Sequence, residues 1–281
     1  MTLVVTALKP QFVVQLSDMR LTDLTTQAVR NEEQSKAIVL STADARVVVG
    51  WCGLATDTHN RHNTGDWLMD ALPRLASRQP ALRFPEFINQ FTADATTKFQ
   101  SIAEPLDQKA CSIMMAGWMA PRSDTAVPVT VVVSNCEDED WRRVPARDTF
   151  DQGWKIPRMS PPDKRDREPN MVTVFGAEGA VSKELGRALL LLLRRDPAPM
   201  EVMNVCLRLM REAAAHPVQG KLIGRNWVGV EMRPDSPQAL AHYFPGQDSP
   251  QQFMPNLVTP QQAFKDVRIW TGLGDPPWRK K

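Results

Sequence analysis

The order of strand-like and helix-like segments is the feature that most restricts how this chain can fold. Runs rich in β-branched residues are typical of strands, and apolar residues at helical spacing are typical of amphipathic helices. By these criteria four strands precede two helices, more strands, two more helices and a last strand. The expected strands are residues 1–8, 12–16, 35–40, 47–53, 111–119, 127–134, 171–175 and 227–232, and the expected helices are 66–78, 84–102, 181–195 and 199–215. This order favours an α+β fold, a four-layer αββα sandwich in which a helix pair covers each outer face of two packed sheets.

Composition and charge exclude several classes of function. The 281 residues are 42% hydrophobic and 23% charged, which is typical of a globular chain of one large domain or two small ones. The formal net charge of +2 is too small to suggest nucleic acid as the main partner. A membrane span needs about 20 consecutive apolar residues, and none is present. The N-terminus also lacks the pattern of a signal peptide, so we expect a cytoplasmic protein.

The cysteines and histidines do not predict a metal site. The cysteines are widely spaced, without a CxxC pair, and are expected to be reduced structural thiols; they are Cys52, Cys111, Cys136 and Cys206. His59 and His62 are three residues apart, but the nearby acids complete no metal-site spacing. We therefore expect this segment to be a surface loop, and we expect no metal and no cofactor.

Prolines divide the chain. Pro73 is expected to kink or shorten the first helix. Residues 137–170 combine prolines with charged runs and are interpreted as a solvated surface insertion, with a contact arm or pocket wall as the alternative. From Pro234 onward eight prolines argue against regular core structure, although the aromatic residues there indicate packing on the domain or on a neighbouring subunit. We therefore divide the chain into a domain at 2–232, which contains the insertion, and a C-terminal extension at 233–281.

The N-terminus could combine a nucleophile and a base in one residue. Removal of Met1, which the small side chain of Thr2 permits, leaves Thr2 with both a hydroxyl and a free α-amine. The unperturbed pKa of an α-amine is near ~8, so the amine can accept the hydroxyl proton around neutral pH. The simpler interpretation is that Thr2 only begins an edge strand, and the terminus taken alone favours that interpretation.

Three further residues strengthen the catalytic interpretation. Asp18 ends the second strand, so a hairpin would return it to the side of Thr2, and Lys36 lies on the next strand. A cation near Thr2 lowers the pKa of its amine and hydroxyl, and an acid orients and neutralises that cation. Gly53 follows a strand and has no side chain, so its N–H group can point at a developing oxyanion.

These residues together resemble the proteasome-type family of N-terminal nucleophile hydrolases. That family includes proteasome β-subunits and the bacterial proteasome-like peptidases that work with an unfolding ATPase. The resemblance covers roughly residues 2–232, without the C-terminal extension. It rests on Thr2-Leu3-Val4-Val5, Ser17-Asp18-Met19-Arg20, Lys36-Ala37-Ile38, Val49-Gly50-Trp51-Cys52-Gly53, Phe175-Gly176-Ala177-Glu178-Gly179, Arg187-Ala188-Leu189, and Ile223-Gly224-Arg225 before the strand that begins at Trp227.

The resemblance implies a role for each matching residue. Thr2 matches the nucleophile, and Asp18 matches the acid that partners the lysine. Lys36 matches the lysine that tunes the threonine, and Gly53 matches the glycine whose N–H group holds the oxyanion. Arg20 matches a structural residue near the site.

The sequence also departs from the family pattern. Where the family has Gly-Ser-Gly, this chain has Gly176-Ala177-Glu178, so the assisting serine hydroxyl is replaced by Ala177. Glu178 is expected to be a turn or surface carboxylate. The family's later Asp-x-x-Ser has no clean match in residues 213–220. Loss of these groups would weaken proton handling at the amine.

Two functions therefore compete. The first is a threonine-type hydrolase that cleaves peptide or amide bonds through Thr2, with the peptide or protein substrate unidentified. The second is a non-catalytic ring or binding subunit, which the alanine at 177 favours; retention of Thr2, Asp18, Lys36 and Gly53 favours the first. The resemblance further implies self-association into rings and an ATP-dependent unfoldase as partner. Neither nucleic acid nor a membrane is expected as a partner.

Overall fold

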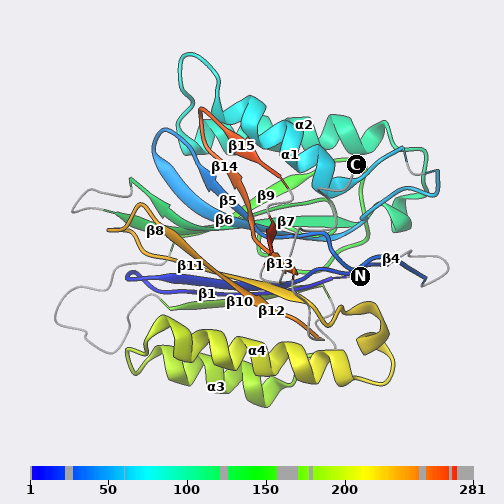
Figure 1. The fold of residues 1–281 in the computed structure, drawn as a ribbon. Helices are drawn as coiled ribbons and strands as arrows, with labels where there is room; N and C mark the ends of the chain where they lie inside the picture. Colours follow the sequence, from blue (N-terminus) through cyan, green and yellow to red (C-terminus); the bar gives the residue numbers. More distant parts are fainter. Residues whose placement is uncertain are drawn as a thin grey trace.

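The computed structural model is a sandwich of two β-sheets between two pairs of helices (Figure 1). It describes residues 2–22, 28–59, 61–120, 126–156, 170–176, 180–246, 251–265 and 268–270. The four-layer αββα arrangement predicted from the sequence is confirmed.

The first sheet has five antiparallel strands in the order β10-β1-β2-β11-β12. Helices α3 and α4 cover its outer face (Figure 1), and alternate residues of β1, such as Leu3 and Val5, join their apolar core. These elements are β1 (Leu3–Leu8), β2 (Val13–Asp18), β10 (Met171–Gly176), β11 (Trp227–Met232), β12 (Ala239–Phe244), α3 (Lys183–Leu193) and α4 (Pro199–Ala215).

The second sheet has seven strands in the order β15-β14-β5-β6-β7-β8-β9, and its β14–β5 pair is parallel. Helices α1 and α2 cover its outer face, and Trp51 and Trp67 lie in the core between them. These elements are β5 (Ile38–Ser41), β6 (Ala45–Gly53), β7 (Cys111–Met119), β8 (Val127–Ser134), β9 (Asp151–Lys155), β14 (Asn256–Val258), β15 (Ala263–Phe264), α1 (Thr64–Ala76) and α2 (Phe84–Gln100).

The inner faces of the two sheets form a third apolar layer. Every residue of β1 and β2 is buried, because one face packs on the helices and the other on the second sheet. Strands buried on both faces appear in sequence as nearly continuous apolar runs, which is why the first strands were visible from the sequence. The remaining short elements are β3 (Leu21–Thr22), β4 (Val29–Asn31), β13 (Gln251–Phe253), β16 (Arg268–Trp270), η1 (Leu106–Gln108) and η3 (Gln219–Leu222).

Two segments expected to lack regular structure contribute strands to the sheets. In the predicted insertion, β9 extends the second sheet beside β8. The segment after Pro234 supplies β12 to the first sheet and β14 to the second. Among the described residues, the prolines of this segment lie outside its strands, so they remove no hydrogen bond from the sheets. Pro73 lies inside α1, which continues to Ala76.

Candidate active site

Lys36 joins Thr2 and Asp18 in one buried cluster. Its Nζ atom lies 2.5 Å from Thr2 Oγ1, 3.0 Å from Asp18 Oδ1 and 2.5 Å from the carbonyl oxygen of Arg20. Lys36 and Asp18 are fully buried, and Thr2 is 2% exposed. The structure therefore brings together three of the four site residues predicted from the sequence.

Strand register brings Asp18 to Thr2. Val4 pairs with Ser17 in the β1–β2 ladder, so Asp18 lies beside the first residues of β1. The N–H group of Leu3 donates to Asp18 Oδ1 at 3.1 Å, and the N–H group of Gly224 donates to Oδ2 at 3.0 Å. Two backbone amides and one ammonium group thus fix the carboxylate, which in turn orients Lys36.

Burial lowers the pKa of Lys36 below its ordinary value of 10.5, because desolvation disfavours the charged ammonium. The carboxylate of Asp18 acts in the opposite direction and favours the ammonium by its charge and by a hydrogen bond. The Nζ atom also lies 5.8 Å from the centre of the Trp51 ring. The lysine is thus held in an environment where a proton can leave it more readily than from an exposed lysine.

Gly53 ends β6 close to this cluster. Its φ angle of +105° is one that side chains disfavour, and a Cβ atom there would lie 2.0 Å from the carbonyl oxygen of Ala110. The thiol of the preceding residue, Cys52, is near enough to act on the pKa of Lys36. The backbone therefore requires glycine at 53, beside the cluster; a role as oxyanion donor stays a prediction.

Arg20 ties the surrounding segments together. Its guanidinium donates to Glu32 Oε1 and to the carbonyl oxygen of Lys221, at 2.8 Å for the latter. Its own carbonyl oxygen accepts from Lys36. The side chain of Arg20 thus binds Glu32 and Lys221, while its carbonyl group contacts the lysine.

Sequence reasoning missed several glycines and amides around the cluster. Gly176 has a φ angle of +98°, and a Cβ atom there would lie 1.6 Å from the carbonyl oxygen of Thr2. Only glycine allows β10 to pass so close to the start of β1, and the signal was a glycine directly after a strand. Gly224 lies in one of the motifs of the resemblance, but its contact with Asp18 was not predicted. The predicted loss at Ala177 and the role of Glu178 lie outside the described residues.

His62 does not lie in the surface loop that was expected. It is 4% exposed, contacts Phe99 edge-on, and its Nε2 atom lies 2.9 Å from Thr64 Oγ1. Burial lowers its pKa to about 4. Among the described residues no cluster of three potential metal ligands occurs, and the four cysteines are buried thiols that form no disulfide with one another.

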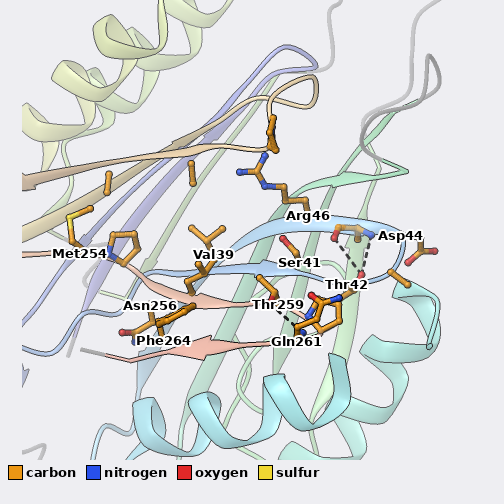
Figure 2. A pocket seen from close by; sticks show the side chains of 18 of the residues that line it. Val39, Ser41, Thr42, Asp44, Arg46, Met254, Asn256, Thr259, Gln261 and Phe264 are labelled. Atoms are coloured by element: carbon orange, nitrogen blue, oxygen red, sulfur yellow. Dashed lines mark hydrogen bonds between the residues drawn. The ribbon is translucent and has the colours of Figure 1, made fainter. Parts of the chain in front are cut away.

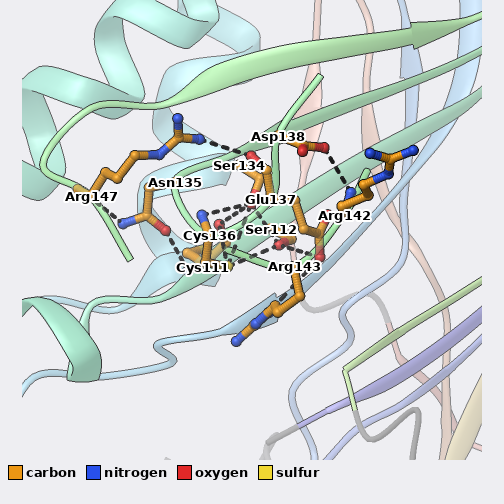
Figure 3. Close-up of polar contacts among 10 residues, drawn as sticks. All are labelled: Cys111, Ser112, Ser134, Asn135, Cys136, Glu137, Asp138, Arg142, Arg143 and Arg147. Carbon is orange, nitrogen blue, oxygen red and sulfur yellow. Dashed lines mark hydrogen bonds and ion pairs between the residues drawn. The ribbon is translucent and has the colours of Figure 1, made fainter. Parts of the chain in front are cut away.

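A second buried polar cluster lies at the end of the second sheet where Gly53 ends β6 (Figure 3). Ser112 Oγ donates to Glu137 Oε1 at 3.1 Å and lies 2.9 Å from Ser134 Oγ. Cys136 Sγ is 3.4 Å from Ser112 Oγ. Ser112 faces Cys52 across the β6–β7 ladder, so this cluster neighbours the one around Lys36.

A cavity of about 1000 Å³ lies away from this chemistry (Figure 2). Its walls include Val39 and Ser41 of β5, Arg46 near the start of β6, and Phe264 of β15. Ala45, at the start of β6, lines the cavity and is about 26 Å from Gly53 at the other end of the strand. Thr2, Asp18, Lys36 and Gly53 are not among the residues that line it. The cavity is therefore not the space in which Thr2 would meet a substrate.

Known proteins resemble this chain in fold only. No family model and no curated protein matches the sequence. Solved structures do match: an Anbu (Gly-1) mutant from Hyphomicrobium sp. strain MC1 has 12% identity and a TM-score of 0.53, covering 89% of this chain and 90% of its own. Anbu from the same strain has 12% identity and a TM-score of 0.51, covering 88% and 89%. Anbu (ancestral beta-subunit) from Yersinia bercovieri has 12% identity and a TM-score of 0.49, covering 85% and 86%.

These matches correct the group assigned from the sequence. The chain has a proteasome-like subunit fold, but its structural neighbours are Anbu proteins. The resemblance to proteasome β-subunits and to the bacterial proteasome-like peptidases was therefore wrong. The motifs behind it, such as Ser17-Asp18-Met19-Arg20 and the strand ending at Gly53, are short, and short motifs do not by themselves identify a family. In the described part of the chain no helix has the length and apolar character needed to cross a membrane.

Proposed function

We propose that this chain is a threonine-type N-terminal nucleophile hydrolase that cleaves peptide or amide bonds through Thr2 once Met1 has been removed. One observation carries the proposal: a fully buried lysine, paired with a buried aspartate, lies 2.5 Å from the Thr2 hydroxyl. Burying two charges is costly, and the geometry directs the cation at a hydroxyl. A lysine that only stabilised the fold would not need to contact the Thr2 hydroxyl.

The reaction begins with attack of Thr2 Oγ1 on the carbonyl carbon of the scissile amide. The α-amine of Thr2, directly or through a water, takes the hydroxyl proton and delivers it to the leaving amine. The N–H group of Gly53 stabilises the oxyanion of the tetrahedral intermediate. The C–N bond breaks, leaving an ester on Thr2, and water hydrolyses that ester to release the acid and regenerate the hydroxyl.

Lys36 and Asp18 set the reactivity of Thr2. The ammonium group beside the hydroxyl lowers its pKa and stabilises the developing alkoxide. Asp18 holds the ammonium in place and keeps it protonated against the desolvation that favours its neutral form. Both residues therefore act on Thr2 Oγ1, and neither forms a covalent bond to the substrate.

Self-association into rings, an ATP-dependent unfoldase partner and a cytoplasmic location remain part of the proposal. Exposed leucines on α3, Leu190 and Leu191, are the kind of apolar surface that a subunit contact would cover. The competing proposal, a non-catalytic subunit, is favoured by the burial of Thr2, because a substrate must reach its hydroxyl.

Intact-mass spectrometry after incubation with a β-lactone tests the proposal. We expect loss of Met1 and a single acyl adduct, absent from Thr2→Ala and retained in Thr2→Ser, which keeps a hydroxyl. Complete retention of Met1 would refute the proposal, because the α-amine would never form. Removal of Met1 without an adduct would favour the non-catalytic subunit.

A further inference from the structure

Two side-chain amides join the segment that carries Lys36 to the segment that follows Gly53. Gln34 Nε2 donates to Asn63 Oδ1 at 3.0 Å, and Asn63 Nδ2 donates back to Gln34 Oε1 at 3.3 Å. We propose that this reciprocal amide pair is a positioning device that fixes the separation between Lys36 and the backbone at Gly53. Its catalytic consequence rests on the function proposed above.

The Gln34 end of the pair is coupled to Lys36. Gln34 precedes Lys36 by two residues and is 8% exposed. Its backbone N–H group donates to the carbonyl oxygen of Met19 at 3.3 Å, next to Asp18. The segment that carries Lys36 is thus held by two contacts of Gln34. Its backbone N–H group binds Met19, and its side-chain amide binds Asn63.

The Asn63 end of the pair is coupled to Gly53. Asn63 is the N-cap of α1, and the next residue, Thr64, donates through its N–H group to Ala55 O at 2.9 Å. Thr64 Oγ1 also donates to Leu54 O at 2.5 Å. Leu54 directly follows Gly53, so displacement of Asn63 would shift the backbone on which the oxyanion contact depends.

Gly65 gives independent support for a pair that must stay in place. Gly65 is buried in the first turn of α1, where alanine would favour the helix by about 1 kcal/mol. A Cβ atom there would lie 2.0 Å from Gln34 Nε2 and 3.3 Å from Asn63 Oδ1. The helix thus leaves room for the amide pair, at some cost to its own stability.

The pair matters for rate because the two groups act on opposite ends of the reaction. Lys36 stabilises charge on the attacking oxygen, and Gly53 stabilises charge on the carbonyl oxygen. A displacement of about 1 Å between such groups can slow a reaction about 100-fold. Loss of the pair should therefore lower the maximal rate and leave substrate binding largely unchanged.

Three variants separate positioning from stability. Asn63→Ser keeps an N-cap hydroxyl for α1 but is too short to reach Gln34. Gly65→Ala pushes the Gln34 amide aside, while Gln34→Ala/Gly65→Ala removes the clash together with the amide. The maximal rate of β-lactone labelling, the probe concentration at half-maximal rate, and the Tm are measured for each.

We expect each variant to label Thr2 between about 10-fold and 100-fold more slowly at saturating probe, with an unchanged half-maximal concentration. The double variant should regain Tm relative to Gly65→Ala without regaining labelling rate. The proposal would be overturned if the double variant regained both its Tm and its labelling rate. It would also be overturned if Asn63→Ser labelled at the wild-type rate.

Hydrogen exchange at the amides of Leu54 and Thr64 tests the pair without any reaction. Exchange should rise about 10-fold or more in Asn63→Ser and Gly65→Ala, because the anchored segment opens more often. Unchanged exchange would overturn the proposal even if Thr2 is reactive. If wild-type protein forms no adduct, the proposed hydrolase fails, and the exchange result alone decides whether the amide pair holds the two segments.

Discussion

Two buried polar clusters lie side by side at one end of the second sheet, and they hold their charges differently. Lys36 is ion-paired with Asp18, which is itself fully buried, and contacts the hydroxyl at the start of β1. Glu137 contacts Ser112, and its ion partner Arg143 is 3.9 Å away and 64% exposed. The ion pair of the Lys36 cluster is fully buried and contacts the Thr2 hydroxyl. The second cluster joins the loop after β8 to strand β7, and its arginine is exposed to solvent.

The difference separates a reactive arrangement from a structural one. A fully buried ion pair adds little or no stability over apolar packing, because desolvation offsets the attraction. The Lys36–Asp18 pair is therefore poorly explained by stability, whereas the bonds around Ser112 satisfy polar groups that the fold buries. We infer that only the Lys36 cluster affects the reactivity of Thr2.

Replacement of the lysine gives the largest expected effect. Lys36→Met removes the ammonium group from Thr2, and we expect labelling of Thr2 to slow by about 10²–10⁴-fold. The variant also leaves Asp18 buried without its cation, which should lower the free energy of unfolding by about 3–5 kcal/mol. The labelling rate and the free energy of unfolding by chemical denaturation are measured on the same variant. A folded variant that labels at the wild-type rate would contradict the inference that the Lys36 cluster sets the reactivity of Thr2.

Loss of the acid should have a smaller effect. Asp18→Asn keeps the size of the side chain but removes the charge that orients Lys36, and its amide group would face the N–H groups of Leu3 or Gly224. We expect labelling to slow about 100-fold. The change should appear in the maximal rate, since Asp18 is buried away from the probe; a change confined to the half-maximal probe concentration would contradict this role.

The pH dependence of labelling tests the protonation state of Lys36. The unperturbed pKa of an α-amine is near ~8, so the rate should rise as the Thr2 amine loses its proton. The rate should fall at higher pH, where Lys36 loses the proton that stabilises the alkoxide. Burial lowers the pKa of Lys36, so the descending limb should lie below 10.5. A rate that still rises through pH 10.5 would show that the cation is not the reactive form.

The same lowered pKa has a consequence for stability. The protonated lysine costs stability at neutral pH, because the unfolded chain holds that proton more tightly. The cost is relieved as the pH rises through the folded-state pKa toward 10.5. Unfolding measured against Lys36→Met over this range should therefore show the contribution of Lys36 becoming more favourable with pH.

Substitutions in the second cluster should not change the reactivity of Thr2. Glu137→Gln and Ser112→Ala should each lower the free energy of unfolding by about 1–3 kcal/mol, because they leave buried partners poorly satisfied. Labelling rates should stay within about twofold of wild type, which is below the effect of one lost hydrogen bond. A large loss of labelling in a stable variant would extend the reactive site into this cluster.

The layers and the return of Asp18 to Thr2 could be predicted from the sequence because both follow from short-range patterns. Lys36 is 34 residues from Thr2, and its role was inferred from the resemblance to a family. A tight hairpin between β1 and β2 necessarily returns Asp18 to Thr2, and continuous apolar runs mark the doubly buried strands. Paired amphipathic stretches likewise mark α3 and α4.

The remaining features depend on long-range packing that carries no local pattern. β14 pairs with β5 across more than 200 residues, and the prolines around it conceal its strand character. Burial of His62 follows from its contact with Phe99 on α2, and the Gln34–Asn63 pair joins residues 29 apart. None of these partners could be inferred from spacing.

The most direct test of the central claim is where a peptide epoxyketone binds. Such a probe can close a ring only on a residue that offers both a hydroxyl and a free α-amine. Peptide mapping by tandem mass spectrometry should find one adduct, on an N-terminal Thr2, with the probe linked to both its oxygen and its nitrogen. An adduct elsewhere, on Cys52 for example, or an unmodified N-terminus beginning at Met1 would contradict the claim that Thr2 is the nucleophile.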